Sequence, residues 1–335
     1  MTTDDFYQDF LNSFSEFDAD FKNNDDNCDE SSSSSSNKID NDWIDKFFGR
    51  RPGVLRKDFT IHLEQKFLEH CKDGDPFDEF KIADCSILDR ISDRFICEKC
   101  HHSRLYYCYT CFIISPELIG KIPMIRLPIK IDIIKHPQEL NGKSTSTHAM
   151  ILTTPPKDVR IFTYPDMPND WHDLNKIFLL FPKPGSQTVQ EFLQNYYHHH
   201  HNDDEQQQHC LSAEFPIERI VVIDSTWQQT KKILRNVRIQ QLKTLIIDSK
   251  QTMFWRYQRG RPMNHLSTIE AIYYLLIQIH MTMFDLFNNH HDHDHHDHCH
   301  MNVNETFTTE YNGQYDNLLF FFKHTFNLIK NRYHL

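Results

Sequence analysis

Long apolar runs and a secretory signal are both missing from this 335-residue chain. No stretch of about 18 consecutive apolar residues occurs, so the sequence predicts no membrane-spanning helix. The N-terminus, MTTDDFYQDF, is acidic and lacks the basic-then-apolar pattern of a signal peptide. Nine cysteines without such a signal indicate a reducing compartment, where clustered cysteines bind metal more often than they form disulfides.

The chain also lacks an overall excess of basic residues, because its formal net charge is −11. Residues 1–45 hold 13 acidic and two basic side chains, which account for that whole charge. The rest of the chain is neutral overall, but residues 226–262 carry nine Lys or Arg against one acid. A local basic segment on a neutral body is typical of a phosphate-rich partner, although a solvated helix face gives the same pattern.

Low-complexity segments divide the chain into parts. Residues 1–45 include six consecutive serines and cannot bury enough apolar surface to fold, so we expect a disordered acidic tail. We expect an N-terminal helical region over 46–90. Two histidine-rich inserts are expected at 196–214 and 288–304. Such tracts can bind metal, but their irregular ligand spacing favours biased loops.

Between these segments, short apolar stretches alternate with helical patterns. Strands are expected over 123–137, 159–165, 176–182, 219–225 and 242–249, and helices over 225–237, 267–287 and 315–331. This alternation predicts an α/β fold with a mostly parallel sheet that is covered on both faces. Ligands bind beyond the carboxyl ends of the strands in such sheets. The segments 181–185, 224–227 and 248–262 follow strand ends, so we expect them to line one pocket.

Four cysteines form two CxxC pairs that are seven residues apart: Cys97, Cys100, Cys108 and Cys111. Four thiolates are enough for a closed tetrahedral zinc site, in which the metal has a structural role. We therefore predict a small zinc knuckle over residues 91–122. Buried free thiols, a redox pair, or His101 or His102 in place of one cysteine remain as alternatives.

Several segments resemble the DTW-domain family, in the family's order along the chain. IDSTW (223–227) has the D-x-T-W signature, LSTIEAIYYLL (266–276) has the downstream S-T-x-E-A helix start, and the CxxC pairs are similar to the family's N-terminal cysteine cluster. Segments 129–149, 253–262 and 313–322 resemble one eukaryotic subgroup. The resemblance covers roughly residues 90–335, with the two inserts interrupting it.

The resemblance implies a tRNA-uridine aminocarboxypropyltransferase. Such an enzyme moves the 3-amino-3-carboxypropyl group of S-adenosylmethionine to N3 of a uridine, here in the D-loop, and leaves 5′-methylthioadenosine. It also implies a SPOUT-like domain over 123–335, in which the cofactor site can be knotted. A nuclear location is implied, with the cytoplasm as the alternative, and a homodimer is left open.

The polar end of the 219–225 strand supplies the candidate catalytic residues, which are Asp224, Thr226 and Trp227. Asp224 could accept the uridine proton, hold the cofactor's ammonium group, or only cap the next helix. Trp227 could stack on a base or simply pack. The candidate cofactor-binding residues are Ser225, Ser267, Thr268, Glu270 and Lys183. The S-x-x-E spacing also fits a capping box, while a helix start favours anions.

Basic and aromatic side chains near this motif are the candidate RNA contacts. They are Lys231, Lys232, Arg235, Arg238, Arg256, Arg259, Arg261 and Trp255. Basic groups give salt-dependent contacts with the RNA backbone, and interleaved aromatic rings suit an extruded base. Two other interpretations remain open: an S-adenosylmethionine-dependent RNA methyltransferase, and a zinc-containing RNA-binding adaptor without activity.

Overall fold

A computed structural model describes residues 71–72, 74–139, 142, 144–154, 158–202, 215–248, 250–254, 265–289 and 305–332. The expected acidic tail (1–45) and most of the expected helical region (46–90) lie outside these residues. Where residues 71–90 are described, they form turns and one short helix, α4 (Ser86–Asp89).

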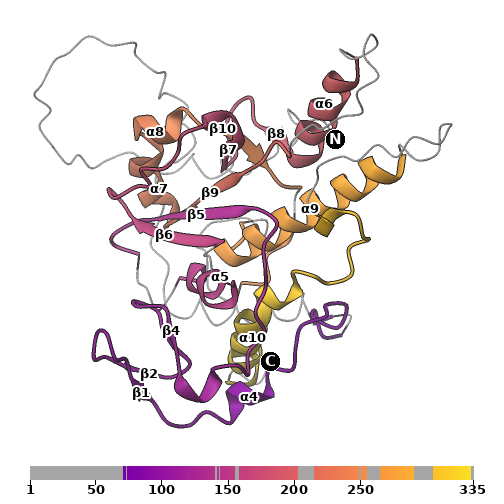
Figure 1. Cartoon of the computed structure of the whole chain (residues 1–335). Helices are drawn as coiled ribbons and strands as arrows, with labels where there is room; N and C mark the ends of the chain where they lie inside the picture. The colour runs from indigo at the N-terminus through magenta and orange to yellow at the C-terminus, as the bar shows by residue number, and fades with distance from the viewer. Residues whose placement is uncertain are drawn as a thin grey trace, which may run out of the picture.

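A six-stranded sheet lies at the centre of the molecule (Figure 1). Its strands are β5 (Lys130–Lys135), β6 (Val159–Thr163), β7 (Ile177–Leu180), β8 (Gln187–Thr188), β9 (Arg219–Asp224) and β10 (Lys243–Ile246). The spatial order is β6-β5-β9-β7-β10-β8, and each adjacent pair is parallel. The predicted α/β fold with a parallel sheet is confirmed. The sequence did not predict β8, because two residues are too few to show a periodic pattern.

Helices cover both faces of the sheet. They are α5 (Ser146–Leu152), α6 (Val189–Asn202), α7 (Trp227–Leu234), α8 (Val237–Gln240), α9 (Thr268–Asn289) and α10 (Phe320–Arg332). Successive strand side chains point to opposite faces, so Ile131 and Ile133 pack with α5, α6, α9 and α10, whereas Ile134 packs with α7 and α8. None of the described helices combines the length and apolar character needed to span a bilayer.

The observed helices differ from the predicted ones at their ends. The helix expected over 225–237 is confirmed as α7, which ends at Leu234. A second helix, α8, then starts at Val237, because the Asn236 side chain accepts a hydrogen bond from the Arg238 N–H. The expected insert at 196–214 begins inside α6, where Tyr197 is buried. Likewise, the expected insert at 288–304 begins at the end of α9. Residues 203–214 and 290–304 lie outside the described residues.

The cysteine segment forms two small hairpins at one end of the molecule (Figure 1). One hairpin pairs β1 (Phe95–Ile96) with β2 (Ser103–Arg104), and the other pairs β3 (Tyr107–Cys108) with β4 (Ile113–Ile114). The Tyr107 ring lies 4.8 Å from that of Phe321, between centroids, and the Tyr106 hydroxyl hydrogen-bonds Nε2 of His324 at 2.9 Å. These contacts attach the second hairpin to α10.

A buried carboxylate on the α7 face of the sheet ties β5, β6 and β9 together. Asp132 is fully buried and accepts hydrogen bonds from Arg160 Nε (2.7 Å), Arg219 Nη1 (3.0 Å) and Trp171 Nε1 (2.8 Å). We expect Asp132→Ala to lower the free energy of unfolding by about 3–5 kcal/mol, because it leaves two guanidinium groups without their buried partner. Urea denaturation measures the change.

The matched control is Asp170→Ala. Asp170 also accepts a hydrogen bond from Arg160, at 2.7 Å, but 40% of its side chain is exposed to solvent. Water can replace this carboxylate, so its removal should cost about 1 kcal/mol or less. Equal losses for the two variants would contradict a special role for the buried carboxylate.

Candidate active site and cysteine centre

Three hydroxyl groups converge on Asp224 at the carboxyl edge of the sheet. Asp224 is the last residue of β9 and is 5% exposed. Its Oδ2 accepts hydrogen bonds from Ser144 Oγ at 2.6 Å and Ser146 Oγ at 2.9 Å. Its Oδ1 accepts one from Thr268 Oγ1 at 2.9 Å. The first residues of α5 and α9 therefore meet at this carboxylate.

Thr226, and not Asp224, caps helix α7. Thr226 is the N-cap, and it forms a capping box in which its own N–H donates to Gln229 Oε1 at 3.0 Å. Ser225 also serves the local structure, because its Oγ lies 2.7 Å from that of Thr230. The hypothesis that Asp224 caps this helix is wrong. The placement of the Trp227 side chain lies outside what the structure describes.

Glu270 organises the start of α9. It is fully buried, and it accepts hydrogen bonds from the Ser267 N–H (2.7 Å), the Met253 N–H (2.6 Å) and Thr252 Oγ1 (2.7 Å). The first of these bonds is the one a capping box requires. The other two hold the segment after β10 against α9. Burial raises the pKa of Glu270. Direct cofactor binding by Ser267 or Glu270 stays a prediction.

Sequence reasoning missed three polar neighbours of Asp224, which are Ser144, Ser146 and Lys135. The two serines lie about 80 positions away in the chain, in a segment noted only for its family resemblance. Lys135 ends β5 and is the register partner of Asp224 across the sheet. Strand alternation places Lys135 on the same face as Ile133, but that it lies beside Asp224 follows only from the pairing of β5 with β9.

The remaining cofactor candidate, Lys183, forms hydrogen bonds with residues in two loops that lead into strands of the sheet. Its ammonium donates to the Leu242 carbonyl at 3.2 Å, and its N–H donates to Ser186 Oγ at 3.0 Å. Burial lowers the pKa of Lys183. These contacts join the β7–β8 turn to the residue before β10, so a role in cofactor binding stays a prediction.

The described RNA candidates lie on α7 and α8. Lys232 and Arg235 are exposed, and Lys231 is half-buried. Arg238 donates to the Pro168 carbonyl and lies over the Trp171 ring, so it also supports the loop after β6. Burial lowers the pKa of His136, and the nearby charge of Lys232 lowers it further. His136 directly follows β5, so Lys232 lies near the carboxyl edge of the sheet that holds Asp224. Arg256, Arg259, Arg261 and Trp255 lie outside the described residues.

The four cysteines form one compact cluster, as predicted. The Sγ atoms of Cys97, Cys100, Cys108 and Cys111 all lie within 4.8 Å of one another. The Cys100 and Cys108 sulfurs are 3.5 Å apart. A tetrahedral zinc ion with Zn–S bonds of about 2.3 Å would set sulfurs about 3.8 Å apart. The donor set therefore fits a closed four-thiolate metal site.

The two CxxC pairs have the same backbone geometry. In the first, the His101 N–H donates to the Cys97 carbonyl at 2.8 Å; in the second, the Phe112 N–H donates to the Cys108 carbonyl at 2.7 Å. His101 and Phe112 both have a left-handed backbone, with φ of 55° and 58°. Non-glycine residues seldom adopt this conformation. The matching backbone geometry of the two turns is consistent with a cluster that could hold a metal ion.

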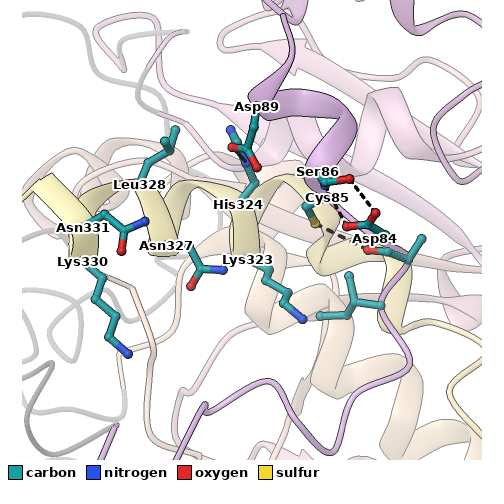
Figure 2. Close-up of a pocket in the computed structure, with 12 residues that line it drawn as sticks. Asp84, Cys85, Ser86, Asp89, Lys323, His324, Asn327, Leu328, Lys330 and Asn331 are labelled. Atoms are coloured by element: carbon teal, nitrogen blue, oxygen red, sulfur yellow. Dashed lines mark hydrogen bonds and ion pairs between the residues drawn. The ribbon is translucent and has the colours of Figure 1, made fainter.

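A separate pocket of about 430 Å³ lies between α4 and α10 (Figure 2). Asp84, Cys85 and Asp89 line it from α4 and the segment before it, and Lys323 and His324 line it from α10. Burial raises the pKa of the Cys85 thiol to about 11, so this cysteine is protonated at neutral pH. None of its lining residues belongs to the Asp224 cluster, and we do not place catalysis here.

Comparison with known proteins identifies the family. The family model described as the DTW domain matches residues 105–330, well over half of the chain. A Homo sapiens protein named tRNA-uridine aminocarboxypropyltransferase 1 is 36% identical over 282 residues, which are 77% of this chain and 84% of that protein. Proteins of the same name from Mus musculus and Xenopus laevis are 34% and 33% identical, over 77% and 70% of this chain and 84% and 80% of their own.

No solved structure matches the chain significantly. The matched region contains the complete Asp224 cluster and two of the four clustered cysteines, Cys108 and Cys111. With this coverage by the family model and these long alignments to the curated relatives, the chain belongs to the DTW domain family.

Proposed function

We propose that this protein transfers the 3-amino-3-carboxypropyl group of S-adenosylmethionine to a uridine of tRNA and releases 5′-methylthioadenosine. Membership of the DTW domain family and the printed name of its relatives support this reaction. The observation that carries the proposal is the Asp224 cluster, because the signature carboxylate lies at the sheet edge where parallel α/β folds bind ligands. The proposal includes N3 of a D-loop uridine as the acceptor and a SPOUT-like arrangement of the domain.

The reaction is an in-line displacement at the methylene carbon of the aminocarboxypropyl group that is bonded to the sulfonium. A bond forms between uridine N3 and this carbon while the carbon–sulfur bond breaks, and the electron pair stays on sulfur. The sulfonium is a good leaving group, so the protein mainly has to position the two reactants. The N3 proton must leave as well, to a carboxylate or to water.

The hydrogen bonds of Asp224 leave room for one more donor. A carboxylate accepts about four hydrogen bonds, and three are supplied by the hydroxyls of Ser144, Ser146 and Thr268. The unfilled direction is on Oδ1. Either the uridine N3–H or the ammonium group of the donor can occupy it, and both are consistent with a carboxylate at this position.

The identity of the small co-product tests the reaction. Purified protein is incubated with unmodified tRNA and S-adenosylmethionine, and the nucleosides in solution are separated by chromatography. We expect 5′-methylthioadenosine to accumulate much faster with tRNA than without it, above the slow spontaneous release from S-adenosylmethionine. S-adenosylhomocysteine in its place would show a methyltransferase. Binding of tRNA with neither co-product would show the non-catalytic adaptor.

We propose zinc as the metal of the cysteine cluster. Cys97, Cys100, Cys108 and Cys111 would hold it, and four thiolates leave no position for a substrate. Its contribution is therefore to the stability of the two hairpins, which carry Tyr106 and Tyr107 against α10. A nuclear location is also part of the proposal, and it rests only on the family resemblance.

The exposed face of α7 should contribute to tRNA binding. We expect Lys232→Ala to weaken tRNA binding and to reduce the slope of log K against log salt by about 1, because one phosphate contact is lost. Lys243→Ala is the control, since Lys243 is also exposed but begins β10, at the amino ends of the parallel strands and away from the carboxyl ends where Asp224 lies. Fluorescence anisotropy with labelled tRNA at several salt concentrations measures both. An equal change of slope for the two variants would contradict a binding face on α7.

A further inference from the structure

Lys135 is a buried lysine beside the signature carboxylate. It ends β5 directly across from Asp224 in the parallel pairing of β5 with β9. Ile133 and Val222 are also register partners, and both belong to the core under α5 and α9. Since side chains alternate between faces, Lys135 and Asp224 project to this same face two residues further on.

The Lys135 ammonium has a charged neighbour but no direct partner. The residue is only 8% exposed. Within the described part of the chain, its ammonium makes no hydrogen bond and no ion pair. Burial lowers the pKa of Lys135, and the carboxylates of Asp224 and Glu139 partly oppose this effect. An ammonium that is partly withdrawn from water and has no hydrogen-bonded anion is poorly compensated, so it points to a ligand that supplies the anion.

The group to be transferred has the matching charges. The aminocarboxypropyl group carries an ammonium and a carboxylate on one carbon, and Asp224 and Lys135 offer one negative and one positive group side by side. We propose that Lys135 binds the carboxylate of the aminocarboxypropyl group of S-adenosylmethionine. The inference rests on the proposed function and deepens it, because it assigns the residue that recognises the part of the donor that is transferred.

In this proposal the two ends of S-adenosylmethionine bind at different places. The carboxylate is held at the β5–β9 edge, while the sulfonium and the nucleoside lie further along the donor. When the carboxylate end of the aminocarboxypropyl group is held, the methylene carbon that uridine attacks is also fixed in position. A methyltransferase would also bind this carboxylate, but only to hold the donor; here the anchored group is itself delivered to tRNA.

Binding of three related ligands tests the assignment without relying on activity. Isothermal titration calorimetry compares S-adenosylmethionine, decarboxylated S-adenosylmethionine, which lacks only the carboxylate, and 5′-methylthioadenosine, which lacks the whole amino acid group. We expect Lys135→Met to weaken S-adenosylmethionine binding by about 10- to 100-fold and to leave the other two affinities unchanged. Lys135→Arg, which keeps the charge, should recover part of the loss.

Lys130→Met is the matched control, because Lys130 lies on the same strand but forms an exposed ion pair with Glu218. It should bind all three ligands as the wild type does. Thermal melting checks folding, and Lys135→Met should melt no lower than the wild type, since it removes a charge that is partly withdrawn from water and has no ion-pair partner. Equal weakening of all three ligands, or no weakening of any, would overturn the proposal while leaving the function intact. A wild-type protein that binds none of them would overturn the function itself.

Discussion

Asp224→Asn should reduce kcat/KM for aminocarboxypropyl transfer by about 10²- to 10⁴-fold. Asparagine keeps the size of the side chain but removes the charge, and its amide group cannot accept hydrogen bonds at both ends. The hydroxyls of Ser144, Ser146 and Thr268 would then compete for one oxygen. Whether Asp224 receives the N3 proton or the donor's ammonium, the negative charge is essential. Steady-state kinetics with tRNA and labelled S-adenosylmethionine measure the loss.

Two controls test whether the loss of activity is due to the Asp224 carboxylate itself. Asp166→Asn makes the same chemical change at an exposed position in the loop after β6 and should leave kcat/KM unchanged. Circular dichroism and thermal melting should show that the Asp224→Asn protein stays folded. A folded Asp224→Asn protein with full activity would mean that the signature carboxylate only organises the ends of α5 and α9.

Removal of the metal from the cysteine cluster should have the largest effect on stability. We expect Cys108→Ser, or extraction with a chelator, to lower the free energy of unfolding by about 4–5 kcal/mol or more. Each hairpin has strands of only two residues, too short to persist without a further constraint. Elemental analysis gives the metal content, with one zinc per chain expected for the wild type, and calorimetry gives the melting temperature.

Cys71→Ser is the matched control for this experiment. Cys71 is a half-buried free cysteine outside the cluster, so its replacement should retain the zinc and most of the stability. A wild-type protein that contains no metal and melts at the same temperature with and without chelator would contradict the metal site. The sulfurs would then be free thiols, one of the alternatives left open by the spacing.

The strands and helices were largely predictable, because local sequence patterns determine them. β9 and its polar end could be recognised from four consecutive apolar residues followed by Asp224 and Ser225. The short helix α8 was not predicted, since its start at Val237 depends on one asparagine side chain that accepts a hydrogen bond from the Arg238 N–H. The helical continuation of 196–202 was obscured by composition, because a histidine-rich sequence says little about whether a helix goes on.

The partners of the site could not be predicted in the same way. Asp224 and Thr268 carry family signatures, but Ser144 and Ser146 reach Asp224 only because α5 begins at the same edge of the sheet. Lys135 reaches it only because β5 and β9 are neighbours. Which strands are adjacent depends on long-range packing, and no local pattern contains that information. The partners of Asp224 therefore could not be assigned before the spatial order of the strands and helices was known.

Mass spectrometry of nucleosides is the most direct test of the central claim. Unmodified tRNA is incubated with S-adenosylmethionine and either the wild-type or the Asp224→Asn protein, and is then digested to nucleosides. We predict a uridine that carries an aminocarboxypropyl group with the wild type and far less of it with the variant. A methylated nucleoside, or no modified nucleoside from a protein that binds tRNA, would contradict the proposed reaction.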